Sequence, residues 1–197
     1  MARRRAPLLY RCLPGSRLRG RPMTHAHPDR LRRALLLAAP ALLAAGCGPA
    51  AASALPAVTL PGLPGLRDRT GQPVPGIEPD TFRRGFALLN IWASWCPYCR
   101  SEHGILEELA GDRRLRLVGL VWQDKAETAA AYLAQRGNPF HAVALDADGV
   151  IAGALRQRGV PSSYLVDGTG AIIARHPGAL TEEWVRTVLK SRLSASI

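Results

Sequence analysis

Two cysteines separated by two residues, Cys96 and Cys99, are the side chains of this chain best suited to covalent chemistry. They lie in the segment NIWASWCPYCRSEH (residues 90–103), between an apolar run and a helix-like stretch. A cysteine attacks as its thiolate, which the unpaired N–H groups of a helix N-terminus favour. Pro97 fits the first turn because its missing N–H is not needed there. The spacing predicts a redox pair, with Cys96 the more exposed and more acidic nucleophile and Cys99 the resolving thiol.

Other uses of a Cys-x-x-Cys pair fit the sequence less well. A disulfide across two residues removes little chain entropy, which argues against a purely structural staple. Zinc needs about four ligands, and the remaining histidines after the leader lack the spacing of a second ligand pair. Covalent haem attachment would need His directly after the second cysteine, where this chain has Arg100. A copper chaperone would usually bring Met or clustered His, but Met1 and Met23 are the only methionines. We therefore expect no metal and no bound cofactor.

The positive charge of the chain is concentrated at its N-terminus. The 197 residues carry a net charge of +11; residues 1–46 hold ten Arg and one Asp, and the rest hold 16 Lys or Arg against 14 Asp or Glu. The nearly neutral remainder argues against nucleic-acid binding. RLRR (residues 30–33) and ALLLAAPALLAA (residues 34–45) have the character of an export signal. We expect residues 1–46 to be a leader, with Met23 a candidate for the true start.

Two forms of membrane attachment are open. LLAAGC (residues 42–47) resembles a lipobox, which predicts lipid on Cys47 after cleavage. The alternative is an uncleaved N-terminal anchor, because no charged residue occurs in residues 34–66. Either would hold the domain on the periplasmic side of the cytoplasmic membrane. Residues 47–64, rich in Ala, Pro and Gly, predict a tether, and residues 65–197 predict a domain long enough to bury one core.

Strand-like and helix-like segments alternate along the rest of the chain. We expect strands at residues 86–93, 115–122, 163–167 and 171–176, helices at residues 97–110, 125–137 and 181–193, and a small hairpin within residues 66–76. This order predicts an α/β fold, with a central mixed sheet, helices on both faces and a small N-terminal hairpin extension.

The motifs around the cysteines resemble a known family. WCPYC after LLNIWAS resembles the thioredoxin fold family, and GLVWQDK, GNPF, DADG, GVPSSYLVDGTG and RHPGAL are similar in order and spacing to CcmG/DsbE-type thiol:disulfide interchange proteins. The resemblance covers roughly residues 60–193. It implies a thioredoxin-like, membrane-tethered reductase of cytochrome c maturation, acting on Cys-x-x-Cys-His cysteines of apocytochrome c or on a partner that carries them. It also implies a membrane electron donor of the DsbD/CcdA type.

The resemblance implies roles for further residues. Pro161 would be a cis proline facing the cysteine pair, and the backbone of Val160 would pair with a substrate strand. Glu102 would raise the pKa of Cys99 or accept its proton, although a solvated helix glutamate fits the sequence equally well. Trp95, Pro97 and Tyr98 would lie against the substrate.

The chain departs from the family after Pro161, where the usual acid is replaced by Ser162. Asn90 stands where many cytoplasmic thioredoxins carry a buried Asp, so Glu102 is the nearest acid. Two other functions stay open. One is a related periplasmic reductase for copper-site assembly or general thiol repair, and the other is an apocytochrome- or metal-binding chaperone without turnover.

Overall fold

A computed structural model of the protein describes residues 54–195. The predicted leader, Cys47 and the first residues of the predicted tether lie outside this range. The strands are β1 (Phe86–Trp92), β2 (Leu115–Val121), β3 (Ala142–Leu145), β4 (Ser162–Val166) and β5 (Ile172–Pro177). The helices are α1 (Pro97–Ser101), α2 (His103–Leu109), α3 (Ala126–Arg136), α4 (Val150–Ala154), α5 (Glu182–Trp184), a π-helical turn η1 (Val185–Leu189) and α6 (Lys190–Ser194).

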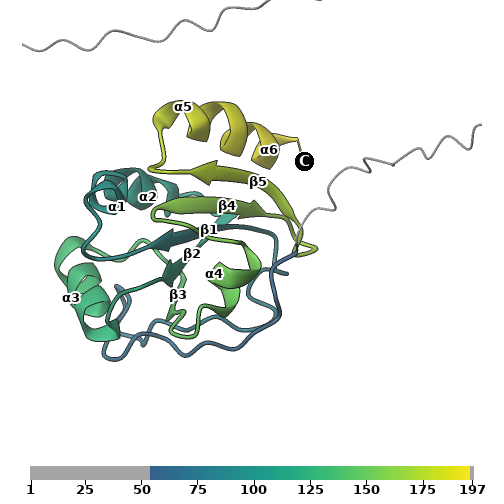
Figure 1. Cartoon of the computed structure of the whole chain (residues 1–197). Helices are drawn as coiled ribbons and strands as arrows, with labels where there is room; N and C mark the ends of the chain where they lie inside the picture. The colour runs from purple at the N-terminus through teal and green to yellow at the C-terminus, as the bar shows by residue number, and fades with distance from the viewer. Residues whose placement is uncertain (1–53, 196–197) are drawn as a thin grey trace, which may run out of the picture. The chain divides into compact units, whose positions relative to one another are not determined.

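The five strands form one mixed sheet in the order β3-β2-β1-β4-β5 (Figure 1). β1 pairs in parallel with β2, and β2 in parallel with β3. β4 is antiparallel to both β1 and β5. The central strand β1 is a continuous apolar run apart from Asn90, as expected for a strand covered on both faces.

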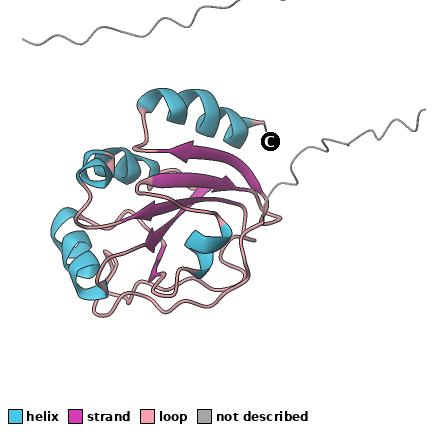
Figure 2. Cartoon of the chain, viewed as in Figure 1, coloured by secondary structure: helices cyan, strands magenta, loops and turns pink. Residues whose placement is uncertain are grey.

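Helices cover both faces of the sheet, so the predicted α/β fold with a central mixed sheet is confirmed. Figure 2 shows the strands as a central layer between helices. Leu88 and Trp92 lie on the face packed against α2, α3 and the C-terminal helical segment. Leu89 and Ile91 point to the other face, which α4 and the N-terminal segment cover. Successive side chains of a strand alternate between faces, so β1 supplies both core layers.

Several element predictions need correction. The helix predicted over residues 97–110 is broken at Glu102 into α1 and α2, and the helix predicted over residues 181–193 contains η1. The prediction omitted β3 and α4, which are only four and five residues long. The Asp146 carboxylate accepts hydrogen bonds from Val150 N (2.8 Å) and Ala152 N (2.8 Å) and so satisfies the first turn of α4.

The N-terminal segment packs onto the domain earlier than predicted. Leu60 and Ile77 exchange two backbone hydrogen bonds of 2.8 and 2.9 Å, and Leu63 is buried. Residues 54–64, predicted as part of a tether, are therefore part of the folded unit. The predicted small hairpin is present, closed by a bridge between Arg67 and Pro73. None of the helices within residues 54–195 is long and apolar enough to cross a membrane.

This packing makes Gly76 sensitive to any side chain. A Cβ atom at Gly76 would collide with the Leu60 carbonyl oxygen and lie 2.6 Å from Gly62 N. Both atoms belong to backbone that cannot rotate away. We expect Gly76→Ala to lower the free energy of unfolding by at least about 2 kcal/mol, measured by urea denaturation.

Gly104 is the matched control. It lies within α2 and a Cβ atom there meets no atom within 4 Å. Gly104→Ala should stabilise the protein by about 0.5–1 kcal/mol, because alanine loses less backbone entropy in a helix. Equal effects of the two substitutions would contradict the packing described for Gly76.

Candidate active site

The cysteine pair lies where β1 ends and α1 begins. Cys96 is the N-cap residue of α1, and its Sγ accepts a hydrogen bond from Cys99 N at 3.2 Å. Pro97 occupies the first turn, as the sequence predicted. The carboxyl end of a central strand followed by a helix N-terminus is a position where loops carry function and where partial positive charge favours an anion.

Both cysteines are buried, which corrects one prediction. Cys96 is 2% exposed and Cys99 is 5% exposed, so Cys96 is not the more exposed thiol. The cause lies in the segment preceding β4. The Val160–Pro161 peptide bond is cis, and the Cys96 thiol donates a hydrogen bond to Val160 O at 3.7 Å. The backbone at Val160 therefore covers the Cys96 sulfur.

Three residues next to the buried cysteines in the chain are exposed. Trp95 is 55% exposed and Tyr98 is 68% exposed, and Pro97 between them also faces solvent. Large aromatic side chains are seldom this exposed, and where they are, they often form a contact surface for another molecule. The three residues predicted to contact a substrate thus lie together on the surface beside the cysteines, with the half-buried Val160 across from Cys96.

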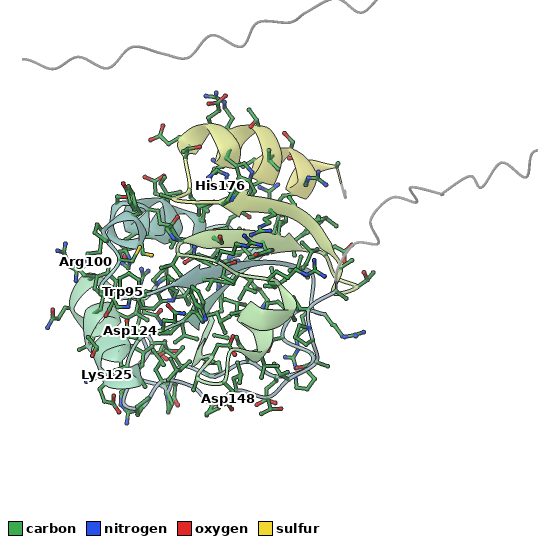
Figure 3. The ribbon with its side chains drawn as sticks, in the orientation of Figure 1. Trp95, Arg100, Asp124, Lys125, Asp148 and His176 are labelled. Carbon is green, nitrogen blue, oxygen red and sulfur yellow. The ribbon has the colours of Figure 1, made fainter. Side chains whose placement is uncertain are left out.

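The loop that carries Cys96 is held by its neighbours. Trp95 Nε1 donates to the Gln123 carbonyl at 2.9 Å, and Ser94 N donates to the Asp124 carboxylate at 2.6 Å. Arg100 Nε donates to the Ser94 carbonyl at 2.9 Å. Figure 3 shows Trp95, Arg100 and Asp124 along the same side of the molecule, beside α3. Arg100 thus holds the loop, a role that the sequence did not indicate.

Asp124 is a site residue that sequence reasoning missed. It follows β2, just as the cysteine loop follows β1. Because carboxyl ends of adjacent parallel strands meet at one edge of a sheet, its position after the second strand was a usable signal. Gln123 adopts a left-handed conformation (φ 52°), which is uncommon for a residue with a side chain.

The carboxyl group of Glu102 is buried at the break between α1 and α2. Its exposed fraction is 1%, so the alternative of a solvated helix glutamate is wrong. Oε1 accepts from Asn90 Nδ2 at 2.9 Å, and Oε2 accepts from Leu180 N at 2.6 Å. Asn90 Nδ2 also donates to Ser163 Oγ at 3.0 Å. One carboxyl group thus connects the active-site helix to β1, β4 and the loop before α5.

Burial is the main cause of the raised pKa values of Glu102 and Cys99. It raises the pKa of Glu102 to about 7, although the hydrogen bonds from Leu180 and Asn90 act in the opposite direction. Burial also raises the pKa of the Cys99 thiol; the hydrogen bond to Cys96 and the charges of Cys96 and Glu102 add to this effect. Asn90 and Ser162 are both buried and uncharged, so neither adds a second acid beside Glu102.

Metal ligands do not gather in the described part of the chain. No group of three or more His, Cys, Asp or Glu side chains within residues 54–195 could hold an ion. His141 Nδ1 instead accepts from Leu117 N at 3.1 Å. His176 Nε2 lies 2.9 Å from the Ala179 carbonyl.

A comparison with protein families identifies the chain. The model of the Redoxin family matches residues 50–191. The chain belongs to the Redoxin family. This Redoxin chain is 41% identical over 103 residues to the thiol:disulfide interchange protein DsbE of Yersinia pestis, an alignment that covers 52% of this chain and 54% of that protein. It is 36% identical over 108 residues to the thiol:disulfide interchange protein CycY of Rhizobium leguminosarum bv. viciae, covering 55% and 58%.

These alignments span about half the length of the curated relatives. Among solved structures, a thiol-disulfide isomerase of Corynebacterium glutamicum superimposes with a TM-score of 0.57 at 17% identity, covering 72% of this chain and 97% of that one. At that identity the superposition establishes the fold. The predicted resemblance to DsbE-type proteins and the thioredoxin-like fold of this Redoxin chain are therefore confirmed.

The raised pKa of Glu102 predicts how stability depends on pH. A carboxyl group whose pKa is higher in the folded protein binds more protons when folded, so the free energy of unfolding falls as pH rises from about 4.5 to about 7. We expect this group to contribute a loss of about 3 kcal/mol, measured as the difference between urea denaturation of the protein and of Glu102→Gln at several pH values.

Glu108→Gln is the matched control, since Glu108 lies in α2, directly after the break at Glu102, and is exposed. It should leave the pH dependence unchanged. If Glu102→Gln reproduced the pH dependence of the unaltered protein, the raised pKa would be wrong.

Proposed function

We propose that the protein is a thiol–disulfide oxidoreductase that reduces disulfides in polypeptides. The observation that carries this proposal is the position of Cys96 Sγ, at the first turn of α1 with Cys99 N 3.2 Å away and the Val160 carbonyl 3.7 Å away. The helix start favours a thiolate, and the cis Val160–Pro161 segment offers backbone for pairing with an extended partner. The relatives named as thiol:disulfide interchange proteins support the same chemistry.

The reaction consists of two thiol–disulfide exchanges. The Cys96 thiolate attacks one sulfur of the partner disulfide; the partner S–S bond breaks, and its other sulfur leaves with the electron pair and takes up a proton. The Cys99 thiolate then attacks Cys96 Sγ of the mixed disulfide, and the second partner sulfur leaves and is protonated. Two electrons pass to the partner, while Cys96 and Cys99 become a disulfide.

The exposed aromatic side chains provide the contact surface in this proposal. Trp95 and Tyr98 flank the thiol, and an indole with a fixed N–H contributes contact area at little cost in conformational entropy. A partner strand lies between this surface and the Val160 backbone. A cysteine of this partner strand then reaches Cys96 at the point where the strand passes the Val160 backbone.

Glu102 acts on the second exchange. Burial is the main cause of the raised pKa of Cys99, and the charge of Glu102 adds to it; together they keep the resolving thiol protonated until the mixed disulfide forms. A carboxyl group with a pKa of about 7 also changes protonation near neutral pH, so it can accept a proton as Cys99 attacks. No second acid supports it at Asn90 or Ser162.

The physiological client we propose is apocytochrome c, or a maturation protein that carries its cysteines. The support is the resemblance of GNPF, DADG and PSSYLVDGTG to CcmG/DsbE-type proteins. The same resemblance supports a periplasmic position, tethered through Cys47 or an uncleaved N-terminal segment, and electrons delivered by a membrane protein of the DsbD/CcdA type.

Trapping of the mixed disulfide tests the activity and the client together. In Cys99→Ala the second exchange is impossible, so the partner should stay linked to Cys96 and appear as a higher band on a non-reducing gel. Mass spectrometry of that band identifies the client. The double variant Cys96→Ala, Cys99→Ala is the control and should trap nothing.

Each outcome of the trap separates the alternatives. Cytochrome c maturation proteins in the band would support the proposed client, whereas copper-site proteins or many unrelated partners would favour the other reductases. If the Cys96–Cys99 pair of the unaltered protein fails to cycle with an external dithiol, the chaperone without turnover replaces the oxidoreductase.

The mode of membrane attachment has its own test. We expect cells grown with labelled palmitate to incorporate the label into this protein, and Cys47→Ser to abolish it, because the lipobox resemblance places the lipid on that sulfur. Membrane attachment without label would favour the uncleaved anchor. Free release into the periplasm would contradict both forms of attachment.

A further inference from the structure

A small cavity lies behind the cysteine pair, on the side of β1 that faces α2 and α3. Its volume is about 10 Å³, close to the minimum that accommodates one water molecule. Cys99 lines it together with Asn90 and Trp92 of β1. The remaining lining is His103, Leu106, Tyr132, Leu133 and Phe140.

Two polar atoms on the cavity-lining residues of β1 are buried without a hydrogen-bond partner among residues 54–195. They are Asn90 Oδ1 and Trp92 Nε1, an acceptor and a donor. Asn90 Nδ2 donates to Glu102 Oε1 and to Ser163 Oγ, which leaves Oδ1 on the opposite side of the amide group. Leaving both atoms unpaired would cost free energy, because buried polar groups are normally hydrogen-bonded.

We propose that this cavity binds one ordered water molecule, which accepts a hydrogen bond from Trp92 Nε1, donates one to Asn90 Oδ1 and donates its second to the sulfur of Cys99. The size of the cavity admits one molecule, and the donor, the acceptor and the adjacent sulfur provide the two to four partners that a buried water requires. Trp92 is then a positioning residue, which acts on Cys99 through the water.

The water gives Cys99 a hydrogen-bond donor on the side away from Cys96. A donor stabilises a thiolate more than a neutral thiol, since hydrogen bonds to charged groups are the stronger ones. It thus opposes the burial and the Glu102 charge that disfavour ionisation. The titratable groups around Cys99 are Cys96, Glu102, His103 and Tyr132, and substitution of Trp92 leaves all four in place.

The first test locates the water. A high-resolution crystal structure of the full-length chain should show one water molecule within hydrogen-bond distance of Trp92 Nε1 and Asn90 Oδ1, and the structure of Trp92→Phe should lack it. A dry cavity in the unaltered protein would overturn the proposal.

The second test measures its effect on Cys99. Cys96 is first joined to a small chromophoric aromatic thiol, and the rate at which Cys99 releases that thiol is followed by absorbance. Trp92→Phe should slow the release about tenfold at fixed pH, the effect of one lost hydrogen bond to a thiolate. Leu133→Val alters the same cavity wall without removing a donor, and Trp122→Phe makes the same exchange on the other face of the sheet. Both controls should stay within about twofold of the unaltered protein; equal slowing by Leu133→Val would overturn the role of the water.

If Trp92→Phe does not fold, NMR of the unaltered protein decides the question. With ¹⁵N-labelled tryptophan, the indole N–H of Trp92 should exchange magnetisation with a long-lived water molecule, and a missing signal would overturn the proposal. The water site is independent of the proposed function. Only the effect of the water on physiological partners rests on the proposed function. The trapping experiment with Cys99→Ala tests that function separately.

Discussion

The buried carboxyl group of Glu102 is the interaction on which the arrangement of the site depends. Its two oxygen atoms accept from β1 through Asn90 and from the loop before α5 through Leu180. Asn90 in turn reaches Ser163 on β4. Because Glu102 also separates α1 from α2, the same carboxyl group fixes the orientation of the short helix that Cys96 caps and that contains Cys99. Burying a carboxyl group costs free energy, and the hydrogen bonds of Glu102 offset part of this cost. They also give Glu102 a structural role that a surface glutamate would lack.

The two cysteines differ in their electrostatic surroundings and hardly differ in exposure. Cys96 Sγ accepts the Cys99 N–H at the start of α1, where the partial positive charge of a helix N-terminus lies. Cys99 is disfavoured as a thiolate by burial and by Glu102. In the proposed reaction, the division of roles between attacking and resolving thiol therefore follows from the neighbours of each sulfur. The solvent access of the two sulfur atoms depends instead on the Val160 backbone and the exposed aromatic residues.

Much of this fold was predictable because its signals are local. The apolar run of β1, the helix formers of α3 and the turn between β4 and β5 each identify one element from its own residues. The elements that were missed, β3 and α4, are too short for a periodic pattern, and α4 depends on bonds from Asp146. The break at Glu102 was also unpredictable, since a glutamate suits a continuous helix and the partner that holds it, Leu180, lies 78 residues away.

The active site, like the fold, has features that local sequence signals predict and features that they do not. The cysteine spacing and the proline at the helix start are local in the sequence, so the placement of both cysteines at the start of a helix was predicted directly. The burial of Cys96 was not, because it is produced by Val160, which lies 64 residues further along the chain. Asp124 and Gln123 likewise act on the cysteine loop across two adjacent strands. Contacts between distant segments leave no periodic signal, and they are the contacts that set the burial and acidity of the site.

The hydrogen bond between Cys96 and Val160 links ionisation of the thiol to the binding of a partner strand in the proposed reaction. A thiol has a proton to donate to the Val160 carbonyl, whereas a thiolate has none, so ionisation breaks this bond. The carbonyl of the half-buried Val160 then lacks a donor, and a backbone N–H of an extended partner can supply one. The same step that creates the nucleophile therefore makes the adjacent backbone available for docking. Trp95 remains held by Gln123 throughout, because that bond involves neither sulfur.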